Sequence, residues 1–208
     1  MARRKMERLD IVREFGFTIQ VPPTVFHPSL FRSSRLFASY LNGIDFTGKS
    51  VLDVGCGSGI LSLIAASKGA KVTAVDINPE SVRITSENAI ANNLRDKIVS
   101  LKSDLFCDLP KGSIFDTIIV NPPYYPGLPV TIADHAWKGG NNYEYFERFG
   151  SNVDKKMGNN AEILIILSSD SDLHKIINII TSNRIKLEPV KKYKKLFEEL
   201  TIYRGIVT

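Results

Sequence analysis

The stretch that decides the fold is Val51-Leu52-Asp53-Val54-Gly55-Cys56-Gly57-Ser58-Gly59, an apolar run that breaks into alternating glycines before a helix-like segment. This pattern predicts a β-strand, a tight loop and a helix. Glycine permits the positive φ angles and the close ligand approach that such a loop requires, and the start of the helix offers unpaired N–H groups. The loop therefore suits the carboxylate of an amino-acid group. Its GxGxG spacing differs from the GxGxxG of dinucleotide-binding loops, and the Asp53 anion would attract an ammonium group and repel a pyrophosphate.

Short apolar runs alternate with longer helix-like segments on both sides of this stretch, which is typical of βα units and a parallel sheet. The expected strands are Val51–Val54, Val72–Val75, Ile98–Leu101, Phe115–Val120 and Ile163–Leu167. The expected helices are Ser33–Leu41, Ile60–Lys68, Pro79–Asn92 and one that begins at the N-cap cluster Ser168-Ser169-Asp170. The alternating tail Ile185–Val207 predicts an antiparallel hairpin at one sheet edge. The fold class is therefore α/β, with a mostly parallel sheet, helices on both faces and an antiparallel C-terminal hairpin.

The 208 residues, 43% of them hydrophobic, suit one domain: an irregular extension with a lead-in helix over 1–45, and a Rossmann-like core over 46–208. The basic start Arg3-Arg4-Lys5 is not followed by the apolar stretch of a signal peptide, so we expect a cytoplasmic protein without a membrane anchor. A net charge of +5 is compatible with an anionic partner such as RNA. Cys56 and Cys107 lack the paired spacing of a metal site and are expected to be buried, and no metal is expected.

Two further acidic residues follow expected strands. Asp76, in Val75-Asp76-Ile77-Asn78-Pro79, lies about one βα unit after the glycine loop, where a carboxylate can accept hydrogen bonds from both hydroxyls of a ribose. Asp104 could accept from an adenine amino group while Leu105 or Phe106 covers the ring. These residues indicate an adenosine, which belongs equally to a nicotinamide dinucleotide and to S-adenosylmethionine.

The segment Asn121-Pro122-Pro123-Tyr124 follows the fourth expected strand, on the side where open α/β sheets bind ligands. An amide or aromatic amine is a poor nucleophile unless it is held in the right geometry, because its lone pair is delocalised. The Asn121 side-chain oxygen and the Pro122 carbonyl can each accept one N–H, and Tyr124 can stack on a planar acceptor. Together with the glycine loop, this segment favours methyl transfer to nitrogen.

In these motifs the chain resembles class I S-adenosylmethionine-dependent methyltransferases, specifically the amino-methylating group whose catalytic loop reads Asn-Pro-Pro-Tyr. The resemblance covers Phe46 to about Leu167 and implies a seven-stranded sheet with a reversed final strand. S-Adenosylmethionine would be the cofactor and S-adenosylhomocysteine the product. The implied cofactor-binding residues are Asp53, Gly55, Cys56, Gly57, Gly59, Asp76, Ile77, Asp104, Leu105 and Asn121, and the implied catalytic residues are Asn121, Pro122, Pro123 and Tyr124.

A second segment, Ala136-Trp137-Lys138-Gly139-Gly140, is similar to the Trp-x-Gly-Gly segment of short HemK-type methyltransferases, which methylate a release-factor glutamine. Val25-Phe26-His27-Pro28 is similar to the approach of that family to its cofactor, whereas Ser29–Ser34 replaces an acidic residue and a threonine. This resemblance favours a protein glutamine as acceptor, with a translation factor as partner. An exocyclic amine of an rRNA or tRNA base and a small-molecule amine remain as alternatives, and monomer is the simplest oligomeric state.

Two readings from other classes are less favoured. A nicotinamide-dependent oxidoreductase would use a different glycine spacing, and a catalytically idle nucleic-acid-binding relative would require a damaged cofactor or catalytic loop. His27 and His135 could line the mouth of a site, while Trp137 is expected to be a packing residue. No side chain is assigned as a base, because nitrogen becomes acidic as it gains the methyl group.

Overall fold

The structure is a computed structural model that describes residues 8–196 and 198–208, so the basic residues Arg3, Arg4 and Lys5 lie outside it. Its strands are β1 (Asp10–Glu14), β2 (Phe17–Val21), β3 (Ser50–Val54), β4 (Lys71–Asp76), β5 (Ile98–Lys102), β6 (Phe115–Val120), β7 (Met157–Ser168), β8 (Ile185–Lys195) and β9 (Glu198–Val207). Its α-helices are α2 (Arg32–Leu41), α3 (Ile60–Ser67), α4 (Pro79–Ala91), α5 (Glu144–Val153) and α6 (Leu173–Thr181). Short 3-10 turns, η1 (Arg95–Lys97), η2 (Ile132–Ala136) and η3 (Asp154–Lys156), complete the list.

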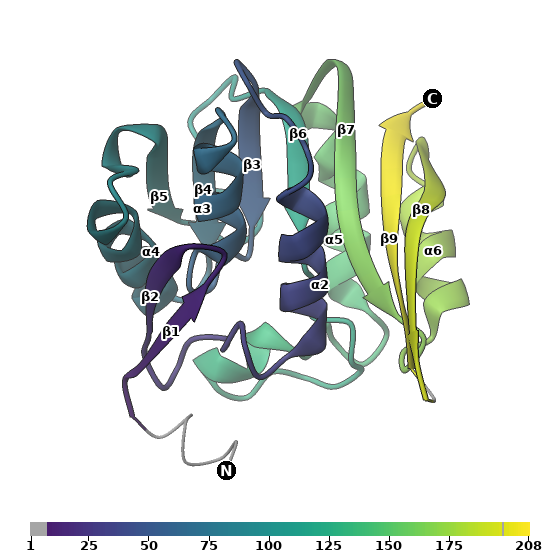
Figure 1. The fold of residues 1–208 in the computed structure, drawn as a ribbon. Helices are drawn as coiled ribbons and strands as arrows, with labels where there is room; N and C mark the ends of the chain where they lie inside the picture. The colour runs from purple at the N-terminus through teal and green to yellow at the C-terminus, as the bar shows by residue number, and fades with distance from the viewer. Residues whose placement is uncertain (1–7, 197) are drawn as a thin grey trace.

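A seven-stranded sheet in the order β5-β4-β3-β6-β7-β9-β8 forms the centre of the molecule (Figure 1). Strands β3 to β7 are parallel. The central residues of β3, β6 and β7 are buried on both faces, as their short apolar runs predicted, whereas the edge strand β5 exposes Val99. Strand β9 runs antiparallel to both β7 and β8, so the C-terminal hairpin closes one edge with a reversed strand. The predicted α/β fold class is confirmed.

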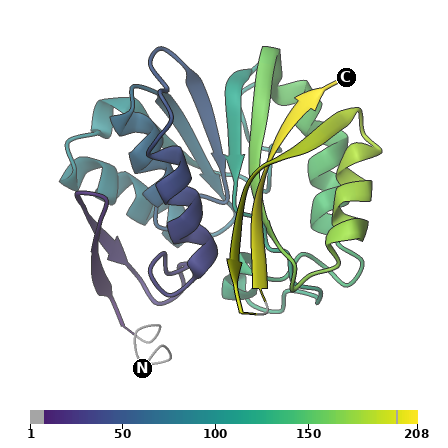
Figure 2. The ribbon, with the colours of Figure 1, turned by 45° about the vertical axis from the view of Figure 1, so that its right-hand side comes forward.

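Helices cover both faces of this sheet (Figure 2). One hydrophobic core lies under α2, α3 and α4 and includes Phe37, Leu63 and Ile84. The other lies under α5 and α6 and includes Phe146 and Ile176. No helix in the described part of the chain is long and apolar enough to cross a membrane.

The N-terminal region differs from its prediction. Residues before α2 were expected to be irregular, but β1 and β2 form an antiparallel hairpin whose turn uses positive φ at Phe15 and Gly16. The hairpin forms because the inward residues Val12, Ile19 and Val21 join the core below α4 and α2.

Three smaller expectations also need correction. Helix α5 was not predicted, although Phe146, Phe149 and Val153 recur at helical spacing and are buried. Helix α6 is capped by the Asp172 side chain, which accepts from Lys175 N; Ser168, part of the expected cap cluster, instead ends β7 and is fully buried. Cys56 is buried as expected, but Cys107 is exposed because it lies in the turn after β5.

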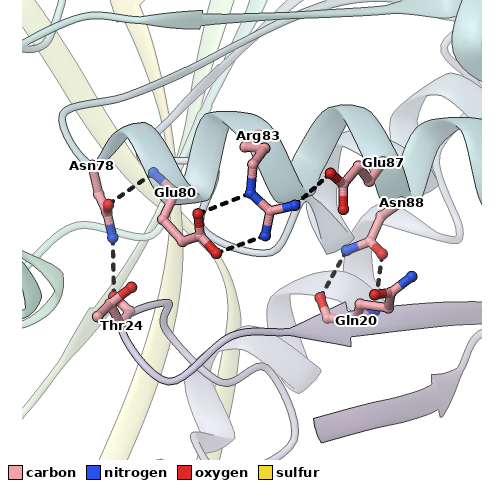
Figure 3. A network of polar contacts seen from close by, with 7 residues as sticks. All are labelled: Gln20, Thr24, Asn78, Glu80, Arg83, Glu87 and Asn88. Carbon is pink, nitrogen blue, oxygen red and sulfur yellow. Dashed lines mark hydrogen bonds and ion pairs between the residues drawn. The ribbon is translucent and has the colours of Figure 1, made fainter. Parts of the chain in front are cut away.

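Two asparagines of α4 hold the N-terminal hairpin in place. The Asn88 side chain accepts from Gln20 N at 2.9 Å and donates to the Gln20 carbonyl at 2.9 Å (Figure 3). It also donates to the Ser58 carbonyl, inside the glycine loop. One turn further along the helix, Asn92 makes the same pair of hydrogen bonds to the backbone of Thr18. The hairpin is thereby joined to α4 and, through Asn88, to the glycine loop.

Asn88→Ala should lower the free energy of unfolding by about 2–4 kcal/mol, because it leaves buried backbone groups of Gln20 and Ser58 without partners. The measurement is urea unfolding followed by circular dichroism. Asn92→Ala is the matched control, since its hydrogen bonds are nearer the surface and water can replace them at a cost of about 1 kcal/mol. An equal loss in both variants would contradict the role given to Asn88.

Candidate functional site

A cavity of about 350 Å³ opens where the carboxyl ends of β3, β4 and β6 meet. Its volume lies within the range of about 300–1,000 Å³ that is usual for small-molecule sites. Nine of the predicted site residues line it: Gly55, Cys56, Gly57, Asp76, Ile77, Asp104, Leu105, Asn121 and Pro123. The other four, Asp53, Gly59, Pro122 and Tyr124, are not among the residues that line it. The loops that the sequence singled out therefore converge on one site.

The glycine loop is hydrogen-bonded to the end of β4. The Val75 carbonyl accepts from both Gly55 N at 2.8 Å and Cys56 N at 3.0 Å. Gly59 begins α3 with a φ of 84°, and a Cβ there would lie 3.0 Å from the Thr85 side chain, so the position suits glycine. The loop wraps closely around one end of the cavity.

Asp76 lies in the cavity wall with both carboxylate oxygens engaged. Oδ2 accepts from Gly57 N at 2.9 Å, and Oδ1 accepts from Asn78 N at 2.8 Å. Loss of hydration raises the pKa of Asp76, and these two N–H donors oppose the rise. The Ser81 hydroxyl also donates to this carboxylate. A carboxylate has about four lone-pair sites, so with three donors present it can still accept from a ribose hydroxyl.

The far end of the cavity combines residues from two elements. Asp104, after β5, forms an ion pair with Arg148 of α5 at 2.6 Å. Leu105 lines the cavity, whereas Phe106 turns away from it and packs on Phe149 in the core. Of the two residues proposed to cover an adenine, Leu105 is therefore the one in position.

Tyr145 of α5 is a cavity residue that sequence reasoning missed. It lines the cavity together with Asp76 and Asp104. Loss of hydration, and then the charges of these two acids, raise the pKa of its phenol. The helical spacing of the aromatic residues in α5 was the signal that could have revealed it. Its place in the same cavity as both acids makes Tyr145 a further candidate for packing on an adenine.

Asp53 is fully buried between β3 and α3. The Ser62 hydroxyl donates to its Oδ2 at 2.6 Å, while Oδ1 has no partner among the described residues. Burial raises the pKa of Asp53 to about 7. A nearby ammonium group would stabilise the charged form of this carboxylate, so the predicted role stays a prediction that the unpartnered oxygen supports.

The Asn121 amide is held by residues that lie far from it in sequence. Its Nδ2 donates to Ser34 Oγ at 3.1 Å and to Ser33 Oγ at 3.4 Å, both in the first turn of α2. Its Oδ1 accepts from none of the described residues. Since Asn121 lines the cavity, this arrangement leaves the acceptor oxygen available to a ligand. The segment Ser29–Ser34, which departs from the resembled family, thus supplies the support for Asn121.

The residues that follow Asn121 in this loop pack against α2 and the Trp-x-Gly-Gly segment. Tyr124 is buried and hydrogen-bonded to Ser33, and burial raises its pKa to about 12. Stacking of Tyr124 on an acceptor stays a prediction, because its ring does not line the cavity. Gly139 pairs with the backbone of Tyr125, and a Cβ at Gly139 would overlap the Pro123 carbonyl. The Trp-x-Gly-Gly segment therefore braces the Asn-Pro-Pro-Tyr loop.

One tryptophan and two histidines that the sequence singled out differ in whether they line the cavity. Trp137 packs against Phe26 and Phe31, whose rings stack 4.2 Å apart, as expected of a packing residue. His135 lines the cavity. His27 does not, because it is buried between Asp10 and Ser29 at 3.0 and 3.1 Å.

The family model described as Methyltransferase small domain matches residues 16–194, which is most of the chain. The chain belongs to this family. A relative from Methanocaldococcus jannaschii, provisionally named a protein N5-glutamine methyltransferase, is 32% identical over 198 residues, covering 92% of this chain and 96% of the relative. A ribosomal protein L11 methyltransferase of Porphyromonas gingivalis is 41% identical, but the match covers 48% of this chain and 34% of that protein.

Solved structures share the fold at low sequence identity. A Pyrococcus furiosus methyltransferase has a TM-score of 0.67 and 19% identity, covering 92% of this chain and 89% of that one. The T. thermophilus 16S rRNA N2 G1207 methyltransferase, in complex with AdoMet and guanosine, has a TM-score of 0.66 and 21% identity. That match covers 94% of this chain and 49% of the T. thermophilus chain. The present chain therefore spans about half the length of the T. thermophilus protein.

The protein is an S-adenosylmethionine-dependent methyltransferase, and the residues of the cavity fit that cofactor. The glycine loop suits the amino-acid end, and the Asp76 carboxylate suits the ribose. Asp104 and Leu105 line the same cavity, and their contact with an adenine stays a prediction. Among the described residues, no group of three or more His, Cys, Asp or Glu side chains could hold a metal ion.

Asp76→Ala should weaken S-adenosylmethionine binding by about 1.5–3 kcal/mol, roughly 10- to 150-fold, through loss of charge-assisted hydrogen bonds. Isothermal titration calorimetry measures the affinity, with NAD as the comparison ligand. Asp116→Ala is the matched control, because that carboxylate binds Ser50 at the opposite end of the sheet. Unchanged affinity in the Asp76 variant would place the ribose elsewhere, and tighter binding of NAD would contradict the cofactor assignment.

Proposed function

We propose that this methyltransferase transfers a methyl group to the side-chain amide nitrogen of a protein glutamine, with a translation factor as the candidate substrate. The observation that carries the proposal is the unengaged Oδ1 of Asn121 in the cavity wall, behind which two serines hold Nδ2. The relative from Methanocaldococcus jannaschii supports it, because its name states the same reaction and the match covers nearly both chains. The RNA-modifying structures support the fold alone.

A primary amide must be oriented by the protein, because its nitrogen is a poor nucleophile. When bound, S-adenosylmethionine supplies an electrophilic methyl group. An amide N–H donated to Asn121 Oδ1, and a second donated to the Pro122 carbonyl, would turn the face of the nitrogen toward that methyl group. A glutamine carries both N–H groups on one atom, so it can satisfy both acceptors at once.

Asn121 is held in place by the first turn of α2. The hydroxyls of Ser33 and Ser34 accept from Nδ2, and this leaves Oδ1 without a partner among the described residues. Ser33 is also hydrogen-bonded to Tyr124. In this orientation the amide presents an acceptor to a substrate N–H, whereas a flipped amide would present N–H groups, which repel it. We infer that these serines position the Asn121 amide for an N–H-bearing acceptor.

The substrate class can be tested by transfer of labelled methyl groups into separate protein, RNA and small-molecule fractions of a cell extract. We expect label in protease-sensitive, nuclease-resistant material, and N5-methylglutamine after complete digestion and mass spectrometry. Heat-inactivated enzyme is the control. Label confined to nuclease-sensitive material, or a different methylated residue, would contradict the proposal.

Asn121→Ala should reduce single-turnover methyl transfer by about a hundredfold or more while leaving cofactor affinity nearly unchanged. A positioned hydrogen bond of this kind contributes on the order of 3 kcal/mol in the transition state. Asn121→Asp should be milder, because an acceptor oxygen survives and the serine hydroxyls can donate to the second oxygen. Rapid-quench measurement gives the rate, and calorimetry gives the affinity.

The combined variant Ser33→Ala/Ser34→Ala extends this test to the support of the amide. It should lower the rate about tenfold, since it releases Asn121 without removing it. Ser29→Ala is the matched control, because its hydroxyl contacts His27 and not Asn121. If Asn121→Ala stays within a few-fold of wild type, or loses cofactor binding together with turnover, the role given to this loop is wrong.

A further inference from the structure

Four exposed apolar side chains follow the Asn-Pro-Pro-Tyr loop at the mouth of the cavity. They form what we call the apolar ridge: Tyr125, Leu128, Val130 and Ile132, with exposed fractions of 40%, 60%, 87% and 41%. Leu128 and Ile132 also line the cavity, whereas Val130 lies further out. The ridge therefore leads from the site of the acceptor to the outer surface. Clustered exposed apolar side chains of this kind mark binding sites.

The ridge is held in an ordered loop. The Asp134 carboxylate accepts from Val130 N at 2.8 Å and from Thr131 N at 3.0 Å. These backbone N–H donors lower the pKa of Asp134 to about 2, so it stays charged and bonded. Gly127 and Gly140 exchange two backbone hydrogen bonds of 3.1 Å at the base of the loop. A preformed apolar surface loses little conformational entropy on binding.

The lysine and the arginine that line the cavity are both in ion pairs. Lys138 of the cavity wall contacts Asp134 at 3.4 Å, and Arg148 contacts Asp104 at 2.6 Å. At the start of α2, Arg32 is paired with Glu198. Binding of a nucleic acid depends on lysine and arginine side chains that can neutralise phosphates. A rim of aliphatic side chains with paired cations suits a polypeptide better.

We propose that the apolar ridge binds an extended polypeptide segment that carries aliphatic side chains within a few residues of the methylated glutamine. The inference rests on the proposed function and adds a sequence preference to it. Burial of one aliphatic side chain against Leu128 and Val130 changes affinity by roughly tenfold. Substrates with aliphatic neighbours are thus selected over substrates with polar ones.

The test uses two synthetic peptides, each with one central glutamine in a glycine and serine background. One carries leucines at positions flanking the glutamine, and the other carries serines there. The wild type should methylate the leucine peptide with a kcat/KM about tenfold higher, mainly through a lower KM. In Leu128→Ser/Val130→Ser this ratio should fall toward one. Val99→Ser is the matched control, because Val99 is also exposed, at 58%, but lies on β5 at the edge of the sheet. It should keep the wild-type ratio.

Failure of this inference can be separated from failure of the proposed function. Equal kcat/KM for both peptides, or a preference that survives in the ridge variant, overturns the ridge while glutamine methylation stands. If neither peptide is methylated, both are made again with a fluorescent label and with alanine in place of the glutamine. Fluorescence anisotropy then measures the affinity of the enzyme for each peptide. Tighter binding of the leucine peptide, lost in the ridge variant, supports the ridge, and equal binding overturns it. Methylation of RNA that depends on the β8 residues Lys191 and Lys195, measured in Lys191→Glu/Lys195→Glu, also overturns it.

Discussion

The hydrogen bonds from the glycine loop to the end of β4 are the constraint on which the rest of the site depends. The Val75 carbonyl accepts from two successive N–H groups, and the Asp76 carboxylate accepts from a third. These bonds bend the chain sharply after β3, so that α3 begins beside the cavity. They also place the Asp76 carboxylate in the wall. One strand end thus positions both the glycine loop, to which we assign the amino-acid part of the cofactor, and the Asp76 carboxylate, to which we assign its ribose.

The acceptor side of the cavity is built from three segments that are distant in sequence. The Asn121 loop contacts the first turn of α2 on one side and the Trp-x-Gly-Gly segment on the other. Neither neighbour belongs to the βα units that present the glycine loop and Asp76. The two halves of the cavity therefore have different origins. The half that we assign to the cofactor follows from the parallel sheet, and the half that we assign to the acceptor is assembled by side chains and short backbone pairings outside it.

This division explains what the sequence could and could not predict. The strands β3 to β6 and the converging loops were predictable, because buried parallel strands have short β-branched runs and their carboxyl ends meet at one edge. The hairpin β1–β2 was missed because each strand has only five residues and few of them point inward. The contact between Ser34 and Asn121 joins residues 87 positions apart, and no local pattern reports such a pairing. The burial of Asp53 and Tyr124 likewise depends on packing from other elements.

The way α4 holds the N-terminal hairpin has a consequence for how the protein avoids association with itself. Asn88 and Asn92 are four residues apart, about 6 Å along a helix, which is close to the spacing of about 6.6 Å between Thr18 and Gln20 in a strand. Each side-chain amide pairs with a backbone N–H and C=O as a neighbouring strand would. The helix thus takes the place of a third strand beside β2. Groups that could otherwise recruit a strand from another molecule are occupied, so this side of the hairpin is closed to edge-to-edge aggregation.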